Sequence, residues 1–240
     1  MIKTLKDKKN LVIILLVLLF LIKVPQEGIK FFLWVLEGIF LCFIFDFLIN
    51  KFFFKRDILP NSAIISGFIV SGILDYRQPW FILVTFCFLA ILSKHIIKFK
   101  DKHIFNPANF ALFLAALFKI PLSWNIESNI FLIIIFGLFF AYTYKKFFHI
   151  LGFLTFFIGL FSVFKVNPLG LISWFFVFIM LIEPKTSGYG NLRGFIFGGI
   201  AAIASFLIFK LIPQYDPNVL SLFSVNLLNP VLEKINNFFS

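Results

Sequence analysis

The stretch that decides the fold is Leu11–Ile49, LVIILLVLLFLIKVPQEGIKFFLWVLEGIFLCFIFDFLI. It contains two apolar runs, 11–24 and 29–49, separated by a short polar segment. A helix needs roughly 20 apolar residues to cross a bilayer. Backbone in lipid must satisfy its own hydrogen bonds, so both runs are expected to be helices. Val24-Pro-Gln26 lacks the small residues of a signal-peptide cleavage site, which favours an uncleaved first span.

The composition extends this pattern to the whole chain. Of the 240 residues, 61% are hydrophobic, 40 are Phe and only 14% are charged, against roughly 25% charged in soluble proteins. The mean hydropathy is +1.01. A soluble domain keeps much of its surface in water and could not hide this much apolar area. The sequence therefore predicts an all-α integral membrane protein, with residues 1–240 forming one polytopic domain in contact with the lipid bilayer.

Charged residues divide the chain into ten predicted spans. They are 11–24, 29–49, 58–73, 79–93, 104–119, 129–144, 147–164, 168–182, 194–211 and 218–232. If these alternate from an inside N-terminus, 16 of the 22 Lys and Arg residues lie on the inside. Loops rich in Lys and Arg stay cytoplasmic, which predicts a cell-membrane protein with both termini cytoplasmic. Eight full spans with re-entrant pieces are an alternative.

The net charge of +11 does not indicate a nucleic-acid-binding protein, because the basic residues lie singly or in short clusters between apolar runs. Cys42 and Cys87 both lie inside apolar runs, far apart, and are expected to be buried thiols. No metal site is predicted, because neither the cysteines nor His95, His103 and His149 have ligand spacing. The histidines are interpreted as surface or packing residues.

Ten spans can form two inverted halves, about 11–119 and 129–232, as in many transport proteins. The third span of each half, 58–73 and 168–182, is short, begins near a proline and contains small residues. Short segments at matching positions favour a binding site at the centre. The alternative is that the small residues only allow close helix packing.

Two carboxylates lie within the second span. Glu37 and Asp46 are nine residues apart, and roughly 100° per residue places them on opposite helix faces. They are therefore not a paired site. Asp46 lies near the inner end, where Lys51 or Arg56 could neutralise it. Glu37 is deeper in the span and is the better functional candidate, since ionisable groups at membrane depth usually serve a pathway or a partner.

Three Asn-Pro pairs also occur in the chain. They are Asn106-Pro107, Asn167-Pro168 and Asn229-Pro230. Proline frees a backbone carbonyl and asparagine offers an amide beside it, so such a pair can line an ion or flavin site. It can equally start or kink a helix.

The order of several motifs resembles the RnfD/NqrB family of membrane subunits. These belong to the Rnf and sodium-translocating NADH:quinone oxidoreductase complexes. The motifs, in chain order, are Asn61-Ser-Ala-Ile-Ile-Ser-Gly67, Gln78-Pro-Trp80, Ser93-Lys-His95, Ile104-Phe-Asn-Pro-Ala108, Glu183-Pro-Lys-Thr-Ser187, Arg193-Gly-Phe-Ile-Phe-Gly198 and Asn226-Leu-Leu-Asn-Pro-Val231. The resemblance covers roughly residues 40–235. It implies two inverted five-helix halves with a urea-channel-like fold.

The resemblance further implies flavin chemistry coupled to Na⁺ or H⁺ movement, with other Rnf- or Nqr-like subunits as partners. Cofactor-binding candidates are Ser66, Gly67, Asn106, Pro107, Glu183, Pro184, Thr186 and Ser187. Ion or solute pathway candidates are Glu37, Asp46, His95, Asn226 and Asn229. The family attaches FMN covalently to the Thr of a Gly-Ala-Thr loop, and no Thr of this chain follows Gly-Ala. FMN or riboflavin is therefore expected to be noncovalent.

Two other functions stay open at this stage. The chain could be a stand-alone channel or carrier for a small solute such as a flavin, without redox chemistry. It could also be a scaffold subunit that completes a larger assembly. Because the sequence contains no iron–sulfur ligands and no nucleotide-binding motif, it is at most one subunit of a translocase and not a complete enzyme.

Overall fold

The computed structural model describes residues 8–55, 60–99, 102–187, 190–228 and 230, and this part of the chain is mostly helical. The α-helices are α1 (Lys8–Glu27), α2 (Ile29–Phe53), α3 (Asn61–Ile73), α4 (Trp80–Ile96), α5 (Pro107–Leu117), α6 (Ile130–Tyr144), α7 (Phe147–Val163), α8 (Asn191–Leu211) and α9 (Pro217–Leu227). A π-helix, η2, spans Phe176–Met180, and two short strands, β1 (Lys98–Phe99) and β2 (Lys102–His103), pair antiparallel. The predicted all-α class is confirmed.

Among the described residues, three helices are long and apolar enough to cross a membrane, namely α1 from Lys9 onward, α2 and α8. The other apolar helices of the described residues are shorter, between 10 and 17 residues. Large apolar side chains cover the outer surface; Phe40 is 62% exposed, Phe131 80% and Val163 77%. Water would not stabilise such a surface, whereas lipid does. These helices indicate a membrane protein.

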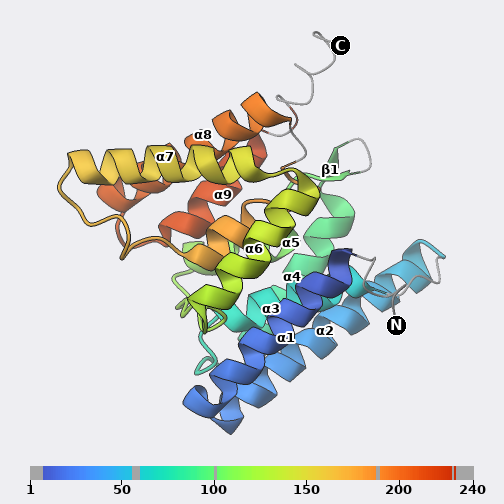
Figure 1. The fold of residues 1–240 in the computed structure, drawn as a ribbon. Helices are drawn as coiled ribbons and strands as arrows, with labels where there is room; N and C mark the ends of the chain where they lie inside the picture. Colours follow the sequence, from blue (N-terminus) through green and yellow to red (C-terminus); the bar gives the residue numbers. More distant parts are fainter. Residues whose placement is uncertain (1–7, 56–59, 100–101, 188–189, 229, 231–240) are drawn as a thin grey trace.

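The helices form two groups that meet near the middle of the molecule (Figure 1). In the first group, α2 packs on α3 and α4, and α4 packs on α5. In the second group α7 lies along α8, and α8 packs on α9. The groups touch where α5 packs on α9 and where α1 packs on α6. The α5–α9 contact includes a bond of 3.1 Å from Asn109 Nδ2 to the carbonyl of Val219, and the rings of Phe113 and Phe223 stack with centroids 3.5 Å apart.

Glycines let two helix pairs approach closely. A Cβ atom on Gly67 of α3 would lie 2.7 Å from the carbonyl oxygen of Gly38 on α2. A Cβ atom on Gly152 of α7 would lie 2.1 Å from the carbonyl oxygen of Phe195 on α8, and one on Gly198 would meet the carbonyl of His149 at the same distance. These contacts are backbone to backbone, so a side chain at any of the three positions would force the helices apart.

The predicted span 168–182 is only partly helical. Residues 167–173 are irregular, and a helix begins at Trp174 and becomes the π-helix η2. Two side chains cap the start. The Glu127 carboxylate accepts hydrogen bonds from the backbone N–H groups of Trp174 (2.6 Å) and Phe175 (3.3 Å), and Ser173 Oγ accepts from the N–H of Phe176 (3.1 Å). Burial raises the pKa of Glu127. The sequence predicts a helix from residue 168, but the caps provided by Ser173 and Glu127 place the helix start six residues later, at Trp174.

The segment that contains Glu127 also holds the end of α3. Backbone N–H groups of Ser123 and Ile126 donate to the carbonyls of Ile73 (2.7 Å) and Gly72 (2.9 Å). One connecting segment therefore ties together α3 and η2, which are the two segments that the sequence picked out as short and proline-led.

The remaining predicted spans correspond to helices with different ends. Residues 58–59 of the third span and residues 229 and 231–232 of the last lie outside the described residues. The fifth helix begins at Pro107 rather than at 104, because the Asn106 side chain caps it by accepting from the N–H of Asn109 at 3.2 Å. The last helix begins at Pro217, capped in the same way by Asp216.

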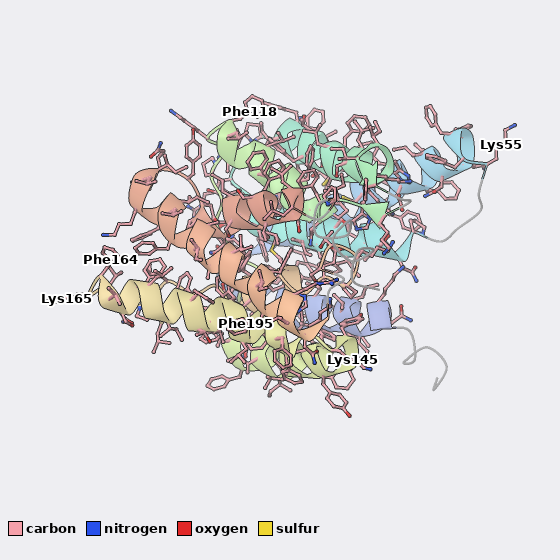
Figure 2. The ribbon with its side chains drawn as sticks, turned by 90° about the horizontal axis from the view of Figure 1, so that it is seen from above. Lys55, Phe118, Lys145, Phe164, Lys165 and Phe195 are labelled. Atoms are coloured by element: carbon pink, nitrogen blue, oxygen red, sulfur yellow. The ribbon has the colours of Figure 1, made fainter. Side chains whose placement is uncertain are left out.

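Lysines lie at both ends of the molecule. Figure 2 shows Lys55 and Lys145 toward one end and Lys165 at the opposite end of α7. Lys145 and Lys165 have the same left-handed backbone conformation, with φ 57°, at the C-terminal ends of α6 and α7.

Candidate functional site

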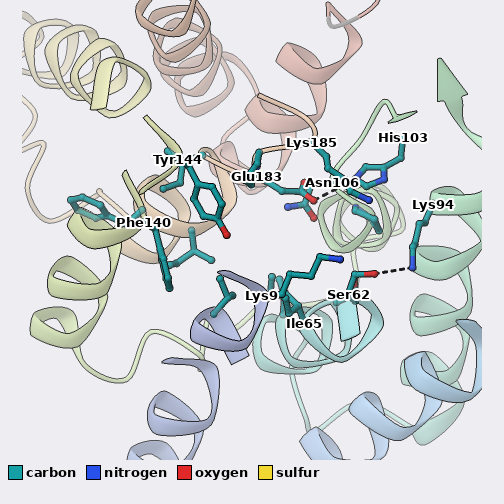
Figure 3. A pocket seen from close by; sticks show the side chains of 18 residues that line it. Lys9, Ser62, Ile65, Lys94, His103, Asn106, Phe140, Tyr144, Glu183 and Lys185 are labelled. Atoms are coloured by element: carbon teal, nitrogen blue, oxygen red, sulfur yellow. Dashed lines mark hydrogen bonds and ion pairs between the residues drawn. The ribbon is translucent and has the colours of Figure 1, made fainter. Parts of the chain in front are cut away.

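A pocket of about 450 Å³ lies where α1, α3, α6 and η2 converge (Figure 3). This volume lies within the roughly 300–1,000 Å³ of small-molecule sites. Four other segments complete its wall: the end of α4, β2, the start of α5, and the loop 182–185 after η2. The lining residues are Lys9, Val12, Ser62, Ile65, Ser66, Ile69, Lys94, His103, Asn106, Pro107, Phe140, Tyr144, Phe178, Ile179, Ile182, Glu183, Pro184 and Lys185.

The pocket has an apolar side and a polar side. Figure 3 shows Phe140 and Tyr144 of α6 on one side. Lys94, His103 and Lys185 lie on the other. The separation suits a ligand with a planar or apolar body and a polar group at one end, because each part of such a ligand would meet a wall of its own chemistry.

Asp46 of α2 lies directly behind the polar side and is 1% exposed. Lys94 Nζ donates to both of its carboxylate oxygens, at 2.9 and 2.7 Å, and also to Ser62 Oγ at 2.9 Å. His95 Nε2 lies 2.6 Å from Asp46 Oδ1, and its ring stacks on Phe54. Asp46 therefore orients Lys94 at the pocket wall. The sequence predicted Lys51 or Arg56 as its partner; Lys51 instead lies over the ring of Phe47, and Arg56 lies outside the described residues.

The loop after η2 is organised around Glu183. Its carboxylate accepts a hydrogen bond from Thr186 Oγ1 at 2.9 Å, and its backbone carbonyl accepts from Ser187 Oγ at 2.7 Å. His103 Nε2 lies 3.4 Å from Glu183 Oε1 (Figure 3). Thr186 and Ser187 are buried and do not line the pocket. They shape the loop that presents Glu183, Pro184 and Lys185 to it.

A second buried polar cluster lies behind this loop. The carbonyl of Ser187 accepts hydrogen bonds from Lys146 Nζ and, at 2.9 Å, from His149 Nε2. Lys146 is 4% exposed, and burial lowers its pKa to about 8. Two side chains from the α6–α7 connection and α7 thus anchor the loop that closes the pocket.

Five of the predicted cofactor-binding residues line this one pocket: Ser66, Asn106, Pro107, Glu183 and Pro184. Gly67 lies instead at the crossing with α2. Of the predicted pathway residues, Asp46 and His95 adjoin the pocket through Lys94. Glu37 is half-buried on α2 and Asn226 is buried in α9, and neither lines the pocket. Asn229 lies outside the described residues.

The three histidines make polar contacts in addition to the packing that the sequence predicted for them. His95 and His103 each face a carboxylate, and His149 holds a carbonyl. Lys9, Lys94 and Lys185 were not predicted as site residues, because lysines at the ends of apolar runs are typical of any cytoplasmic loop. The only signal in the sequence was that Lys94 and Lys185 lie within two of the motifs.

No protein-family model matches this chain, and no curated protein matches it significantly. Among the described residues, no group of three or more His, Cys, Asp or Glu side chains could hold a metal ion.

Proposed function

We propose that the protein is a membrane subunit of an Rnf- or Nqr-like electron transport complex that binds a flavin, FMN or riboflavin, noncovalently in this pocket. The pocket carries the proposal. Ser66, the pair Asn106-Pro107 and the pair Glu183-Pro184 come from three of the motifs that resemble the RnfD/NqrB family, and all line one cavity. Residues that are far apart in sequence but share one cavity are suited to a common ligand.

The proposed membrane arrangement is ten spans in two inverted halves, with both termini cytoplasmic. Two observations support it. The segments α3 and η2, which occupy the third position of each half, both line the pocket, as expected where inverted repeats meet. Lys55 and Lys145, predicted as inside residues, lie toward one end of the molecule, and Lys165, predicted outside, lies at the other (Figure 2).

Asp46, Lys94 and His95 are the proposed link between the flavin site and Na⁺ or H⁺ movement. A buried carboxylate that contacts both a lysine and a histidine can exchange a proton with them. Lys94 lies at the pocket wall, so a charge change on the ligand would act on this cluster over a short distance.

Blocking the pocket tests the proposal. In Ser66→Leu, a larger side chain would enter the cavity, and we expect the affinity for FMN and riboflavin, measured by flavin fluorescence, to fall by more than roughly ten-fold. Ser224→Leu is a control for the loss of the hydroxyl, since both serine hydroxyls donate to the carbonyl four residues earlier and the exposed Ser224 does not line the pocket. Equal flavin affinity in wild type and Ser66→Leu would contradict the proposal.

A stand-alone flavin carrier is the second candidate function. The lack of a Gly-Ala-Thr attachment loop favours it, because a transported ligand must leave its site. Uptake of riboflavin into proteoliposomes by the purified chain alone would support the carrier. Co-purification with other redox subunits, without uptake, would support the electron transport complex.

A further inference from the structure

The mouth of the pocket carries more positive than negative charge. Three lysines, Lys9, Lys94 and Lys185, line it together with one carboxylate, that of Glu183. Asp46, directly behind the wall, offsets the charge of Lys94, so these five side chains together carry an excess of one positive charge. The lysines come from three different segments: α1, α4 and the loop after η2.

The three lysines differ in their contacts and in their exposure at the pocket. The N–H groups of Lys94 point at Asp46 and Ser62, so Lys94 is paired with a carboxylate and acts on the pocket mainly by orienting Ser62. Ser62 Oγ accepts from Lys94, which leaves its own hydroxyl hydrogen for an acceptor in the pocket. Lys9 and Lys185 are both exposed at the mouth. Their flexible side chains can reach a ligand that enters there.

The lysines also act on one another. Partial burial and the ammonium groups of Lys9, Lys94 and Lys98 lower the pKa of Lys185, while Glu183 opposes this effect. Mutual repulsion of this kind disfavours the empty pocket and is relieved when an anion binds among the ammonium groups.

We propose that the pocket selects a phosphate ester on an apolar body, with the phosphate bound at the mouth by Lys9, Lys185 and Ser62 beside Lys94, and the apolar body against the α6 and η2 side chains. A phosphate monoester carries about −1.5 to −2 charges at neutral pH, and the ammonium groups of Lys9 and Lys185 at the mouth would attract it. The identification of the apolar body as a flavin rests on the proposed function. FMN is then preferred over riboflavin, because only FMN carries a phosphate.

Comparing FMN with riboflavin tests the phosphate directly, because the two share one ring system. We expect the purified protein to bind FMN at least roughly ten-fold more tightly than riboflavin, and added salt to weaken only FMN binding. Lys185→Gln should weaken FMN binding about ten-fold and leave riboflavin binding unchanged. Lys145→Gln, an exposed lysine outside the pocket, should change neither.

The failures of the two proposals are distinguishable. Equal binding of FMN and riboflavin would overturn the phosphate inference and keep the flavin function. If neither flavin binds, the flavin function fails, and pyrophosphate then tests the anion site by itself. A rise in Tm with pyrophosphate that Lys185→Gln reduces would support the site, and no rise would overturn it.

The same chemistry could be supplied by an anionic phospholipid. Protein in nanodiscs of phosphatidylcholine, with and without phosphatidylglycerol, separates the two sources. Loss of the pyrophosphate effect when phosphatidylglycerol is present would identify a lipid headgroup as the occupant. An effect of pyrophosphate that is the same in both discs would identify a soluble phosphate ester.

Discussion

At the scale of single residues, Asp46 determines the polar side of the pocket. It is buried between Lys94 and His95, and removing one partner from a buried ion pair costs about 3 kcal/mol or more. In a chain of this size each kcal/mol shifts Tm by about 2–4 °C. We therefore expect Asp46→Asn to lower Tm in detergent by roughly 6–12 °C.

Glu37→Gln is the control for this substitution, because Glu37 lies on the same helix and is half-buried. Its Tm should remain within about 2 °C of wild type. A shift in Asp46→Asn no larger than that in Glu37→Gln would contradict the role given to Asp46.

Lys146 predicts a pH dependence of stability. Its pKa is lowered from 10.5 to about 8 by burial, so between pH 8 and 10.5 the folded protein binds fewer protons than the unfolded chain. The free energy of unfolding should then rise with pH in this window, by at most about 1.4 kcal/mol per pH unit from this group. Below pH 8 Lys146 is protonated in both the folded and the unfolded state, so the folded protein bears the full free-energy cost of burying its charge.

Thermal melts of wild type and Lys146→Met across pH 7 to 11 measure this contribution as a difference. The stability of the variant relative to wild type should fall as the pH rises above 8, because only wild type gains stability from the deprotonation of Lys146. A difference in Tm between wild type and Lys146→Met that does not change with pH would contradict the lowered pKa of Lys146.

The sequence identified candidate site residues better than it identified their partners. Ser66, Asn106 and Glu183 were named from motifs, and all three line the pocket. The partner of Asp46 was expected nearby in sequence, at Lys51 or Arg56, but Lys94 is 48 residues away. Contacts of this range depend on how α2 and α4 pack, and no local pattern in the sequence contains that information.

At the scale of helices, α7 and α8 pack closely through Gly152 and Gly198. In Gly152→Ala the new methyl group would collide with a backbone carbonyl, which costs about 1–3 kcal/mol. Gly159→Ala on the same helix meets nothing within 4 Å, and alanine is the better helix former by about 1 kcal/mol. We expect a lower Tm in Gly152→Ala and an unchanged or higher Tm in Gly159→Ala; equal values would contradict the close approach of the two helices.

The helices were largely predictable, because apolar runs between charges mark them in any membrane protein. The helix start within 168–182 was only partly predictable, because Ser173 caps it locally but Glu127 caps it from a distant connection. The starts of α5 and α9 follow the familiar pattern of a capping side chain followed by proline, Asn106-Pro107 and Asp216-Pro217. The sequence alone could therefore have located the starts of α5 and α9 more accurately.

At the scale of the whole molecule, the proposed topology places Lys145 and Lys165 on opposite sides of the membrane. Both have the same backbone conformation and are exposed, so Lys145→Cys and Lys165→Cys form a matched pair. The native Cys42 and Cys87 are fully buried and should give little background with a membrane-impermeant maleimide. We expect Lys165→Cys to react in intact cells and Lys145→Cys only after permeabilisation. Reaction of both from one side would contradict a crossing by α7.

The central claim is that the pocket holds a noncovalent flavin, and the visible absorption spectrum of the purified protein, taken before and after acid precipitation, tests it most directly. The account predicts a flavin spectrum whose yellow colour is released into the supernatant by acid. Colour that stays with the pellet would contradict noncovalent binding. A folded protein that carries no flavin, and takes up neither FMN nor riboflavin when they are added, would contradict the claim itself.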